Sequence, residues 1–272
     1  MKTLPNCKIN LGLNILSRRT DGYHNLHTVF YPIPLCDELQ VDEAQADEML
    51  VEGIPLDSTP SDNLVWRVVC LLRDKGYHVP PVRVRLTKHI PSGAGLGGGS
   101  SDAAFMMKML NEMFSLHLSD EKMEDFLSSL GADCAVFVRN KPVFAEGIGN
   151  VFTQIPVSLA GMYLLLAKPS DYISTREAYA AVVPAEPAIQ LRQVMTLPIA
   201  EWAGRLVNDF ERSVFPGHPR VAALLDHFYE MGAEYASMSG SGSAVFGLFR
   251  DPVPFDDSFG DCFTFSCRLP LP

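Results

Sequence analysis

The stretch "HIPSGAGLGGGSSDAA", residues 89–104, places five glycines among the seven residues 93–99. Glycine has no Cβ, so it adopts positive φ and allows another group to approach the backbone closely. An alternating strand pattern, "PVRVRLTKHIP", precedes the glycines, and a segment with helical periodicity, "SSDAAFMMKMLNEMF", follows them. The unpaired N–H groups and positive dipole end of that helix therefore point at the glycine loop. This arrangement predicts an anion site, and phosphate is the commonest biological anion that needs one.

Three known glycine motifs fit this loop poorly. A P-loop ends in Gly-Lys followed by Ser or Thr, whereas this loop ends in "GGGSS". A dinucleotide fingerprint, G-x-G-x-x-G, is present at Gly93, Gly95 and Gly98, but it should directly follow a buried parallel strand, and "HIP" intervenes. A serine-hydrolase elbow, G-x-S-x-G, is found neither here nor in the second glycine cluster, "SGSGS", residues 239–243. A flexible linker or tight turn is the remaining alternative, although linkers rarely lead straight into an amphipathic helix.

The composition is typical of an ordinary globular protein. The 272 residues are 47% hydrophobic, which suffices for one large core or, as we expect, two lobes. The net charge of −10 argues against a nucleic-acid partner, because binding a polyanion requires a surplus of Lys and Arg. The six cysteines form no C-x-x-C pair, and no apolar run is long enough to span a bilayer. We therefore expect a cytoplasmic protein with reduced thiols and no membrane partner.

Periodicity and turn signals predict the remaining elements. The acidic run 36–53 is interpreted as a solvated hairpin, because it lacks the ligand spacing of a calcium loop. Asp133 is expected at the mouth of an apolar strand, "AVFV". The pattern breaks at 153–161, which suggests a domain boundary near residue 155. Strands are predicted at 7–16, 24–35 and 162–168. Helices are predicted at 61–76 with Ser61 or Asp62 as cap, from the cap Ser119 to an exit at Gly131, from about Ser174, at 201–211 and at 219–231.

The loop sequence "PSGAGLGGGSSDAA" resembles the phosphate loop of the GHMP kinases, the family of galactokinase, homoserine kinase and mevalonate kinase. Two further blocks match in order, "KINLGLNILSRRTDGYHNLHT" near the N-terminus and "MSGSGSAVFGLF" near the C-terminus. The "DGYH" after the first strand is typical of one member of the family, and the chain resembles that member over nearly its full length. That member phosphorylates an alcohol that carries a cytidine diphosphate group.

The resemblance implies an α+β, two-lobed GHMP kinase fold with mixed, largely antiparallel sheets and packed helices. Residues 1–155 would form an N-terminal domain with the phosphate loop, and residues 156–272 a C-terminal domain that completes the cleft. The implied reaction transfers the γ-phosphate of ATP to the 2-hydroxyl of a diphosphocytidyl methylerythritol in non-mevalonate isoprenoid precursor biosynthesis. Two alternatives stay open: another small-alcohol GHMP kinase of the homoserine or mevalonate type, and a catalytically silent nucleotide-binding protein of the same fold.

The resemblance also implies a catalytic pair, Lys8 and Asp133. From spacing alone, a solvent-facing strand lysine and a turn aspartate would be the preferred interpretations of these two residues. A carboxylate next to a cation stays ionised and can accept a proton from an alcohol. Whether Asp133 is a true base or mainly a positioning group stays open at this stage.

Two further residue sets follow from the same resemblance. For ATP, backbone amides of the loop would hold the phosphates, Ser100 and Ser101 could reach phosphate or magnesium, and the helix start would contact adenine. For the substrate, Tyr23 would stack on cytosine while His24 reads the base edge. The full ATP set is Asn63, Leu64, Lys88, Pro91, Ser92, Gly93, Ala94, Gly95, Leu96, Gly97, Gly98, Gly99, Ser100 and Ser101. The full substrate set is Asn10, Tyr23, His24, Tyr172, Thr175, Ser239, Gly240 and Ser241. Helix caps, surface positions, core packing and tight turns are the plain structural alternatives for these residues.

We predict no protein metal ligand. Some GHMP kinases carry a magnesium-binding glutamate in the interval that here contains Glu112, Glu121 and Glu124, but these three lie on amphipathic helices. Magnesium would then be held mainly by the ATP phosphates and water. The expected partners are therefore ATP, Mg²⁺ and the small-molecule substrate, in a monomer or homodimer.

Overall fold

The computed structural model describes residues 1–56 and 62–270, and their packing divides the chain into two interleaved units. Unit 1 comprises Met1–Lys8, Leu35–Ser92 and Gly97–Lys141, and unit 2 comprises Ile9–Pro34, Gly93–Leu96 and Pro142–Pro272. The chain changes unit within two long strands and again within the glycine loop. These packing units follow a different division from the predicted domains, whose boundary near residue 155 stays a prediction.

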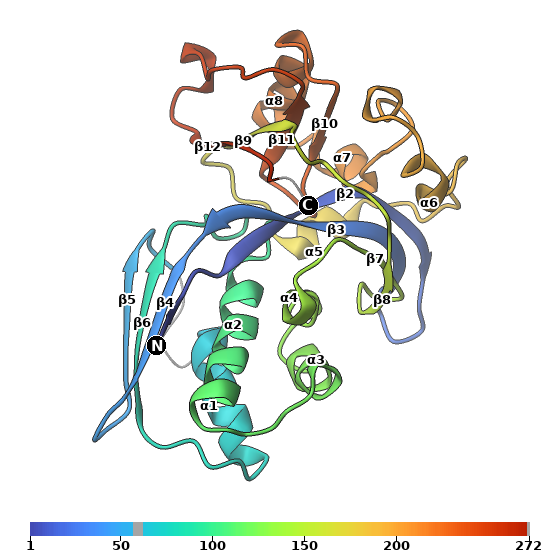
Figure 1. Ribbon diagram of the computed structural model, residues 1–272. Coiled ribbons are helices and arrows are strands. Elements are labelled where there is room, and N and C mark those ends of the chain that lie inside the picture. The colour runs from blue at the N-terminus through green and yellow to red at the C-terminus, as the bar shows by residue number, and fades with distance from the viewer. Residues whose placement is uncertain (57–61, 271–272) are drawn as a thin grey trace. The chain divides into compact units, whose positions relative to one another are not determined.

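The sheet of unit 1 has the order β1-β4-β6-β5, with β1 at Lys2–Thr3, β4 at Glu38–Glu43, β5 at Glu48–Gly53 and β6 at Val82–Lys88 (Figure 1). The predicted hairpin at 36–53 is wrong, because β4 and β5 do not pair with each other. Instead β6 lies between them, antiparallel to β4 and parallel to β5. The alternation in β6 explains this placement, since it turns three apolar side chains to the core: Val82, Val84 and Leu86.

The helices of unit 1 are α1 (Leu64–Asp74), α2 (Gly98–Met113), α3 (Asp120–Ser128) and α4 (Val136–Arg139), and they lie on one side of its sheet (Figure 1). Asn63 caps α1, because its Oδ1 accepts a hydrogen bond from the Val65 N–H at 2.9 Å. The predicted cap at Asp62 is therefore wrong, and Ser61 lies outside the described residues. Ser119 caps α3 as predicted.

The segment after Asp133 forms the short helix α4, not the predicted apolar strand. Four apolar residues are too few for periodicity to separate a buried strand from a buried helix. Val136, Phe137 and Val138 are all buried, so the segment is apolar because it packs inside unit 1. Asp133 consequently lies in the turn between α3 and α4.

Unit 2 contains two sheets (Figure 1). One has the order β2-β3-β7-β8, with bounds Asn6–Arg18, His24–Cys36, Val143–Glu146 and Val151–Gln154. The other has the order β10-β11-β9-β12, with bounds Tyr235–Met238, Val245–Phe249, Tyr163–Lys168 and Phe263–Arg268. Pairings along the second sheet are antiparallel, so the fold is α+β with mixed, largely antiparallel sheets, as predicted.

Short helices complete unit 2: α5 (Thr175–Ala180), α6 (Leu191–Val194), α7 (Asp209–Val214) and α8 (Pro219–Glu230). The helix predicted at 201–211 is wrong in extent. A 3₁₀ turn, Ile199–Glu201, ends where that helix should begin, and α7 begins only after its cap, Asn208. α5 begins directly after its N-cap Ser174, at the predicted start of this helix.

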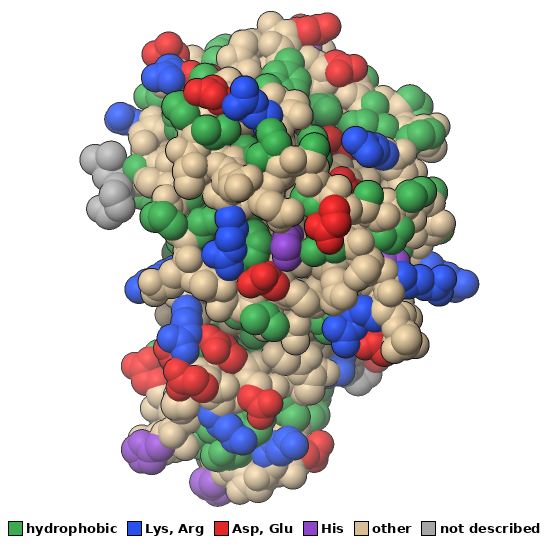
Figure 2. Space-filling model, turned by 90° about the vertical axis from the view of Figure 1, so that its right-hand side faces the viewer, with side chains coloured by type: hydrophobic (Ala, Val, Ile, Leu, Met, Phe, Trp, Pro, Cys, Tyr) green, Lys and Arg blue, Asp and Glu red, His purple; other side chains and the backbone are tan. Residues whose placement is uncertain are grey.

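The surface carries mixed charge. On the face shown in Figure 2, basic and acidic side chains are interspersed. Several of the exposed basic side chains of the protein form ion pairs, such as Arg83 with Glu48 and Arg220 with Asp261. All six cysteines are free. Among the described helices, none has the length and apolar character that a membrane crossing requires.

Candidate active site

The glycine loop reaches α2 through three left-handed backbone positions, Gly93, Gly95 and Gly97, whose φ angles are +59°, +72° and +70°. Gly97 is the N-cap of α2, and no side chain accepts a hydrogen bond from the first turn of the helix. The N–H groups at the start of this 16-residue helix are thus left without a side-chain cap, as an anion site requires.

Within unit 2, the first half of the loop is held against the turn that joins β10 to β11. A Cβ built on Gly95 would lie 1.8 Å from the Ser239 carbonyl oxygen, so only glycine fits there. The Ser239 hydroxyl donates to the Gly95 carbonyl at 2.9 Å, and the Ala244 N–H donates to the Ala94 carbonyl at 3.2 Å. Asn208 fixes the turn itself by donating to the Met238 and Gly240 carbonyls. The second glycine cluster therefore supports the loop backbone.

Within unit 1, the second half of the loop adjoins the predicted catalytic pair. The Lys8 ammonium lies 3.4 Å from Asp133 Oδ2, and the Lys8 side chain is 3% exposed against 35% for Asp133. A Cβ built on Gly97 would lie 3.2 Å from Lys8 Cε, so the lysine stem passes directly beside the N-cap of α2. Residues far apart in the sequence thus place a cation and a half-exposed carboxylate at the start of this helix.

The two loop serines have different environments. Ser101 is buried, and its hydroxyl donates to the Asn6 carbonyl at 2.6 Å, so that hydroxyl is already used within unit 1. Ser100 is partly exposed, and its hydroxyl interacts with the Cys134 thiol. Ser100 is therefore better placed than Ser101 to offer a hydroxyl to a bound phosphate.

The predicted nucleotide-binding residues outside the loop are Asn63, Leu64 and Lys88. Asn63 is buried as the cap of α1, and Leu64 Cδ1 would lie 3.9 Å from a Cβ built on Gly99. The structure thus brings the start of α1 next to the start of α2. Lys88 is buried and paired with two carboxylates, those of Asp37 and Asp102.

Among the predicted substrate residues in unit 2, Asn10 and Ser239 lie together. The Asn10 N–H donates to the Ser239 hydroxyl at 3.2 Å, and Asn10 Nδ2 donates to the Thr28 hydroxyl at 2.9 Å. Both Asn10 and Ser239 are buried, Gly240 is buried, and Ser241 is partly exposed. Asn10 is therefore held rigidly beside the turn that supports the glycine loop.

The aromatic residues predicted to bind the substrate lie in two places, one around His24 and one beside Gly93. The His24 ring stacks on Tyr179 with centroids 4.8 Å apart, and Tyr179 in turn meets Phe210 edge-on. Tyr23 is exposed, and so is Tyr172, whose ring lies against Gly93. Burial, and then the charge of Arg18, lower the pKa of His24, so near pH 7 its neutral ring offers one donor and one acceptor.

Two family models match the chain: GHMP kinases N terminal domain over residues 63–141, and GHMP kinases C terminal over residues 198–256. A 4-diphosphocytidyl-2-C-methyl-D-erythritol kinase from Bacteroides fragilis is 52% identical over 253 residues, which cover 92% of each chain. The enzyme of that name from Bacteroides thetaiotaomicron is 50% identical and covers 99% of this chain and 100% of its own. The chain belongs to the 4-diphosphocytidyl-2-C-methyl-D-erythritol kinase family of GHMP kinases.

Solved structures agree with this family. A crystal structure of 4-(cytidine 5'-diphospho)-2C-methyl-D-erythritol kinase matches 91% of this chain and 90% of its own, with 31% identity and a TM-score of 0.77. The mevalonate kinase of Methanococcus jannaschii matches 99% of this chain with 14% identity and a TM-score of 0.65, which shows a shared fold alone. The resemblance and the fold predicted from the sequence are confirmed, and the protein is an ATP-dependent kinase.

Membership in the 4-diphosphocytidyl-2-C-methyl-D-erythritol kinase family leaves the individual site residues as predictions. The structure adds Tyr179, which stacks on His24 and which the predicted substrate set does not contain. The sequence does contain a signal for it: Tyr179 follows the predicted Thr175 by four residues on α5, so both lie on one face of that helix. Glu121 and Glu124, two of the glutamates in the magnesium interval, pair with Arg139.

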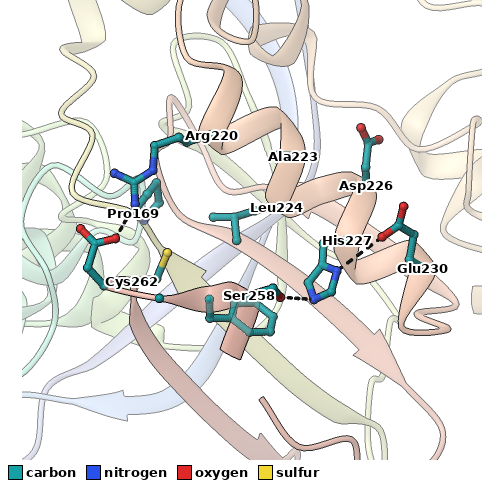
Figure 3. Close-up of a pocket in the computed structure, with 12 residues that line it drawn as sticks. Pro169, Arg220, Ala223, Leu224, Asp226, His227, Glu230, Ser258 and Cys262 are labelled. Atoms are coloured by element: carbon teal, nitrogen blue, oxygen red, sulfur yellow. Dashed lines mark hydrogen bonds and ion pairs between the residues drawn. The ribbon is translucent and has the colours of Figure 1, made fainter. Parts of the chain in front are cut away.

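Unit 2 also holds a surface cavity of about 500 Å³ that contains none of the predicted site residues (Figure 3). Leu224 lines it, and several of its charged groups form pairs. Arg220 pairs with Asp261, while His227 contacts Glu230 and the Ser258 hydroxyl.

Proposed function

We propose that this kinase transfers the γ-phosphate of ATP to the 2-hydroxyl of 4-diphosphocytidyl-2-C-methyl-D-erythritol, in the cytoplasm. The observation that carries the proposal is the 3.4 Å pairing of Lys8 with Asp133 beside the N-cap of α2. High identity to relatives of that name supports the choice of substrate. A kinase needs these parts because phosphoryl transfer depends mainly on alignment and charge neutralisation.

The phosphate loop would hold ATP through its backbone. Gly93, Gly95 and Gly97 give the loop a left-handed backbone without Cβ atoms, which lets an anion approach, and the start of α2 would contribute its positive dipole end. Mg²⁺ would arrive with ATP and stay bound mainly by phosphate oxygens and water, in keeping with its reluctance to dehydrate. When bound, it supplies positive charge to the transferring phosphoryl group.

Asp133 and Lys8 would act on the transferring group. A carboxylate oxygen of Asp133 would accept the proton of the substrate 2-hydroxyl while the hydroxyl oxygen bonds to the γ-phosphorus. The bond from that phosphorus to the β,γ-bridging oxygen breaks, and ADP leaves with the electron pair. Lys8 pairs with Asp133 and would stabilise the negative charge on the phosphoryl oxygens. Because Lys8 is nearly fully buried, its charge is weakly screened by solvent.

Residues of unit 2 would recognise the cytidyl group. Tyr23 and His24 would contact cytosine, the first by stacking and the second through the donor and acceptor of its neutral ring. Tyr179 orients His24 by stacking on it. Asn10, fixed by Thr28 and Ser239, would contact the alcohol near its reacting hydroxyl.

A competition assay tests the substrate. The protein is incubated with ATP, Mg²⁺ and equal concentrations of the diphosphocytidyl alcohol, homoserine and mevalonate, and products are measured by mass spectrometry. We expect phosphate almost entirely on the diphosphocytidyl alcohol. Preferential phosphorylation of homoserine or mevalonate would favour the other small-alcohol kinases, and no transfer to any alcohol would favour a silent nucleotide-binding protein.

A further inference from the structure

Three charged side chains form a buried cluster at the end of β6, in unit 1. Lys88 is the last residue of β6, and its ammonium donates to Asp37 Oδ2 and, at 2.7 Å, to Asp102 Oδ2. The side chains of Lys88, Asp37 and Asp102 are 3%, 0% and 2% exposed. Burying three charged groups away from water is costly. A salt bridge at the surface would avoid this cost, so the burial calls for another explanation.

Asp37 also holds the backbone that enters the phosphate loop. Its Oδ1 accepts hydrogen bonds from the His89 N–H at 2.5 Å and from the Ile90 N–H at 2.8 Å. These two amides follow the last residue of β6, where the ladder ends. The Lys88 carbonyl is fixed as well, because it accepts from the Ile54 N–H at 2.9 Å. The segment from Lys88 to Ile90 is therefore held on both of its edges.

Asp102 connects the same cluster to the other flank of the loop. It lies on α2, close to the start of that helix at Gly98. A Cβ built on Gly98 would lie 2.8 Å from Ile90 Cγ2 and 3.5 Å from Lys88 Nζ, so the start of the helix packs directly on the strand end. One ammonium thus joins the residues before the loop to the helix after it.

We propose that Asp37 is a positioning residue for ATP binding, which fixes both flanks of the phosphate loop through Lys88, His89 and Ile90. The inference rests on the phosphate-binding role of the loop in the proposed function. Lys88, which was predicted to bind the nucleotide, would then contribute to ATP binding indirectly, by holding the backbone of the phosphate loop in place. Asp37 itself has no need to touch the nucleotide.

The electrostatics of the cluster keep Lys88 charged between the two carboxyl groups. Burial by itself lowers the pKa of Lys88, but the charges of Asp102 and Asp37 outweigh it, so that pKa is raised and the ammonium stays charged. Burial raises the pKa of Asp102 to about 7, against the opposing charge of Lys88. A positively charged Lys88 therefore joins the two carboxyl groups of the cluster.

The test compares the binding of a non-hydrolysable ATP analogue, measured by calorimetry, in the wild-type protein and in Asp37→Ala. We expect the Kd of the analogue to rise at least tenfold, while the KM for the alcohol changes less than twofold. Asp37→Asn keeps the oxygen that accepts from both amides but turns an N–H group toward the Lys88 ammonium, so we expect its Kd to lie between those of wild type and Asp37→Ala. Circular dichroism verifies the fold of each variant.

Asp47→Ala is the control, because Asp47 also joins a backbone N–H group to a basic side chain, at the opposite end of β6. It accepts from the Val82 N–H at 3.0 Å and pairs with Arg73 at 2.6 Å, away from the loop. We expect this variant to lower stability and to leave the analogue Kd within twofold of wild type.

Three results would overturn the proposal: a folded Asp37→Ala protein with wild-type affinity, an equal loss of affinity in Asp47→Ala, or an Asp37→Asn protein as weak as the alanine variant. If Asp37→Ala does not fold, Asp37→Ser replaces it, with an expected rise of at least threefold and the same contrary outcome. The analogue binds without the alcohol, so a kinase that rejects the diphosphocytidyl substrate would refute the proposed function and leave this comparison intact.

Discussion

Replacing Gly95 by alanine should disable the phosphate loop far more than it destabilises the protein. The new Cβ would lie 1.8 Å from the Ser239 carbonyl oxygen, whereas real Cβ contacts are essentially never shorter than 3.0 Å, so backbone must shift by about 1.2 Å. A displacement of about 1 Å in groups that align a reaction can reduce rates by about 100-fold. We therefore expect kcat/KM to fall about 100-fold or more in Gly95→Ala.

Gly204→Ala is the matched control for backbone strain. Gly204 has φ of +71°, against +72° for Gly95, and nothing lies within 4 Å of a Cβ built on it. The left-handed conformation alone costs an alanine about 1–2 kcal/mol, and in a chain of this size that lowers Tm by about 2–8 °C. We expect this loss of Tm, with kcat/KM unchanged, in Gly204→Ala, and at least this loss in Gly95→Ala, where the clash adds to the strain.

Steady-state kinetics with ATP and the diphosphocytidyl alcohol, together with differential scanning calorimetry, measure both effects. If Gly95→Ala keeps kcat/KM within threefold of wild type while Gly204→Ala shows the expected loss of Tm, the close approach of the loop to Ser239 has no catalytic importance. The reasoning on the loop geometry would then be refuted.

Two further predictions concern unit 2. Tyr179→Ala removes the stack on His24, so we expect the KM for the alcohol to rise about 3–10-fold with the KM for ATP unchanged, whereas Tyr179→Phe should behave as wild type in the same kinetic assay. Glu211 accepts from the Ser237 hydroxyl and the Met238 N–H, and burial raises its pKa to about 7, above its value in the unfolded chain. Its protonated form therefore stabilises the fold at low pH, and about 2–3 kcal/mol is lost as the pH rises from 5 to 8. Urea unfolding across this range should show a shallower decline in Glu211→Gln, and an identical decline in the two proteins would contradict the assignment.

The sequence predicts the parts of the site whose signals are local. Glycine at three alternating positions indicates a left-handed backbone, which glycine adopts most readily, and the loop has that backbone at all three positions. The cap Ser119 follows from a side chain that bonds to the start of its own helix. The pairing of Lys8 with Asp133 could be expected only from the resemblance, because the two residues lie far apart in the chain.

What the sequence could not give depends on non-local packing. Alternation shows that β4, β5 and β6 are strands but not which of them pair, so the insertion of β6 between the other two was missed. Four apolar residues after Asp133 fit either a strand or a helix, and packing within unit 1 decided for the helix. Asp37 sits in an acidic run that reads as solvated, yet the fold buries it against Lys88.

The rate of a single phosphoryl transfer in Asp133→Asn tests the central claim most directly. Asparagine keeps the size of the side chain but loses its charge and its ability to accept a proton, and general-base catalysis contributes about 100- to 10,000-fold. In a rapid-quench experiment with enzyme in excess over ATP, we predict a loss of at least about 100-fold in the rate of transfer to the diphosphocytidyl alcohol, with the Kd of ATP within threefold of wild type. A variant that transfers phosphate at nearly the wild-type rate would contradict the role of the Lys8 and Asp133 pair.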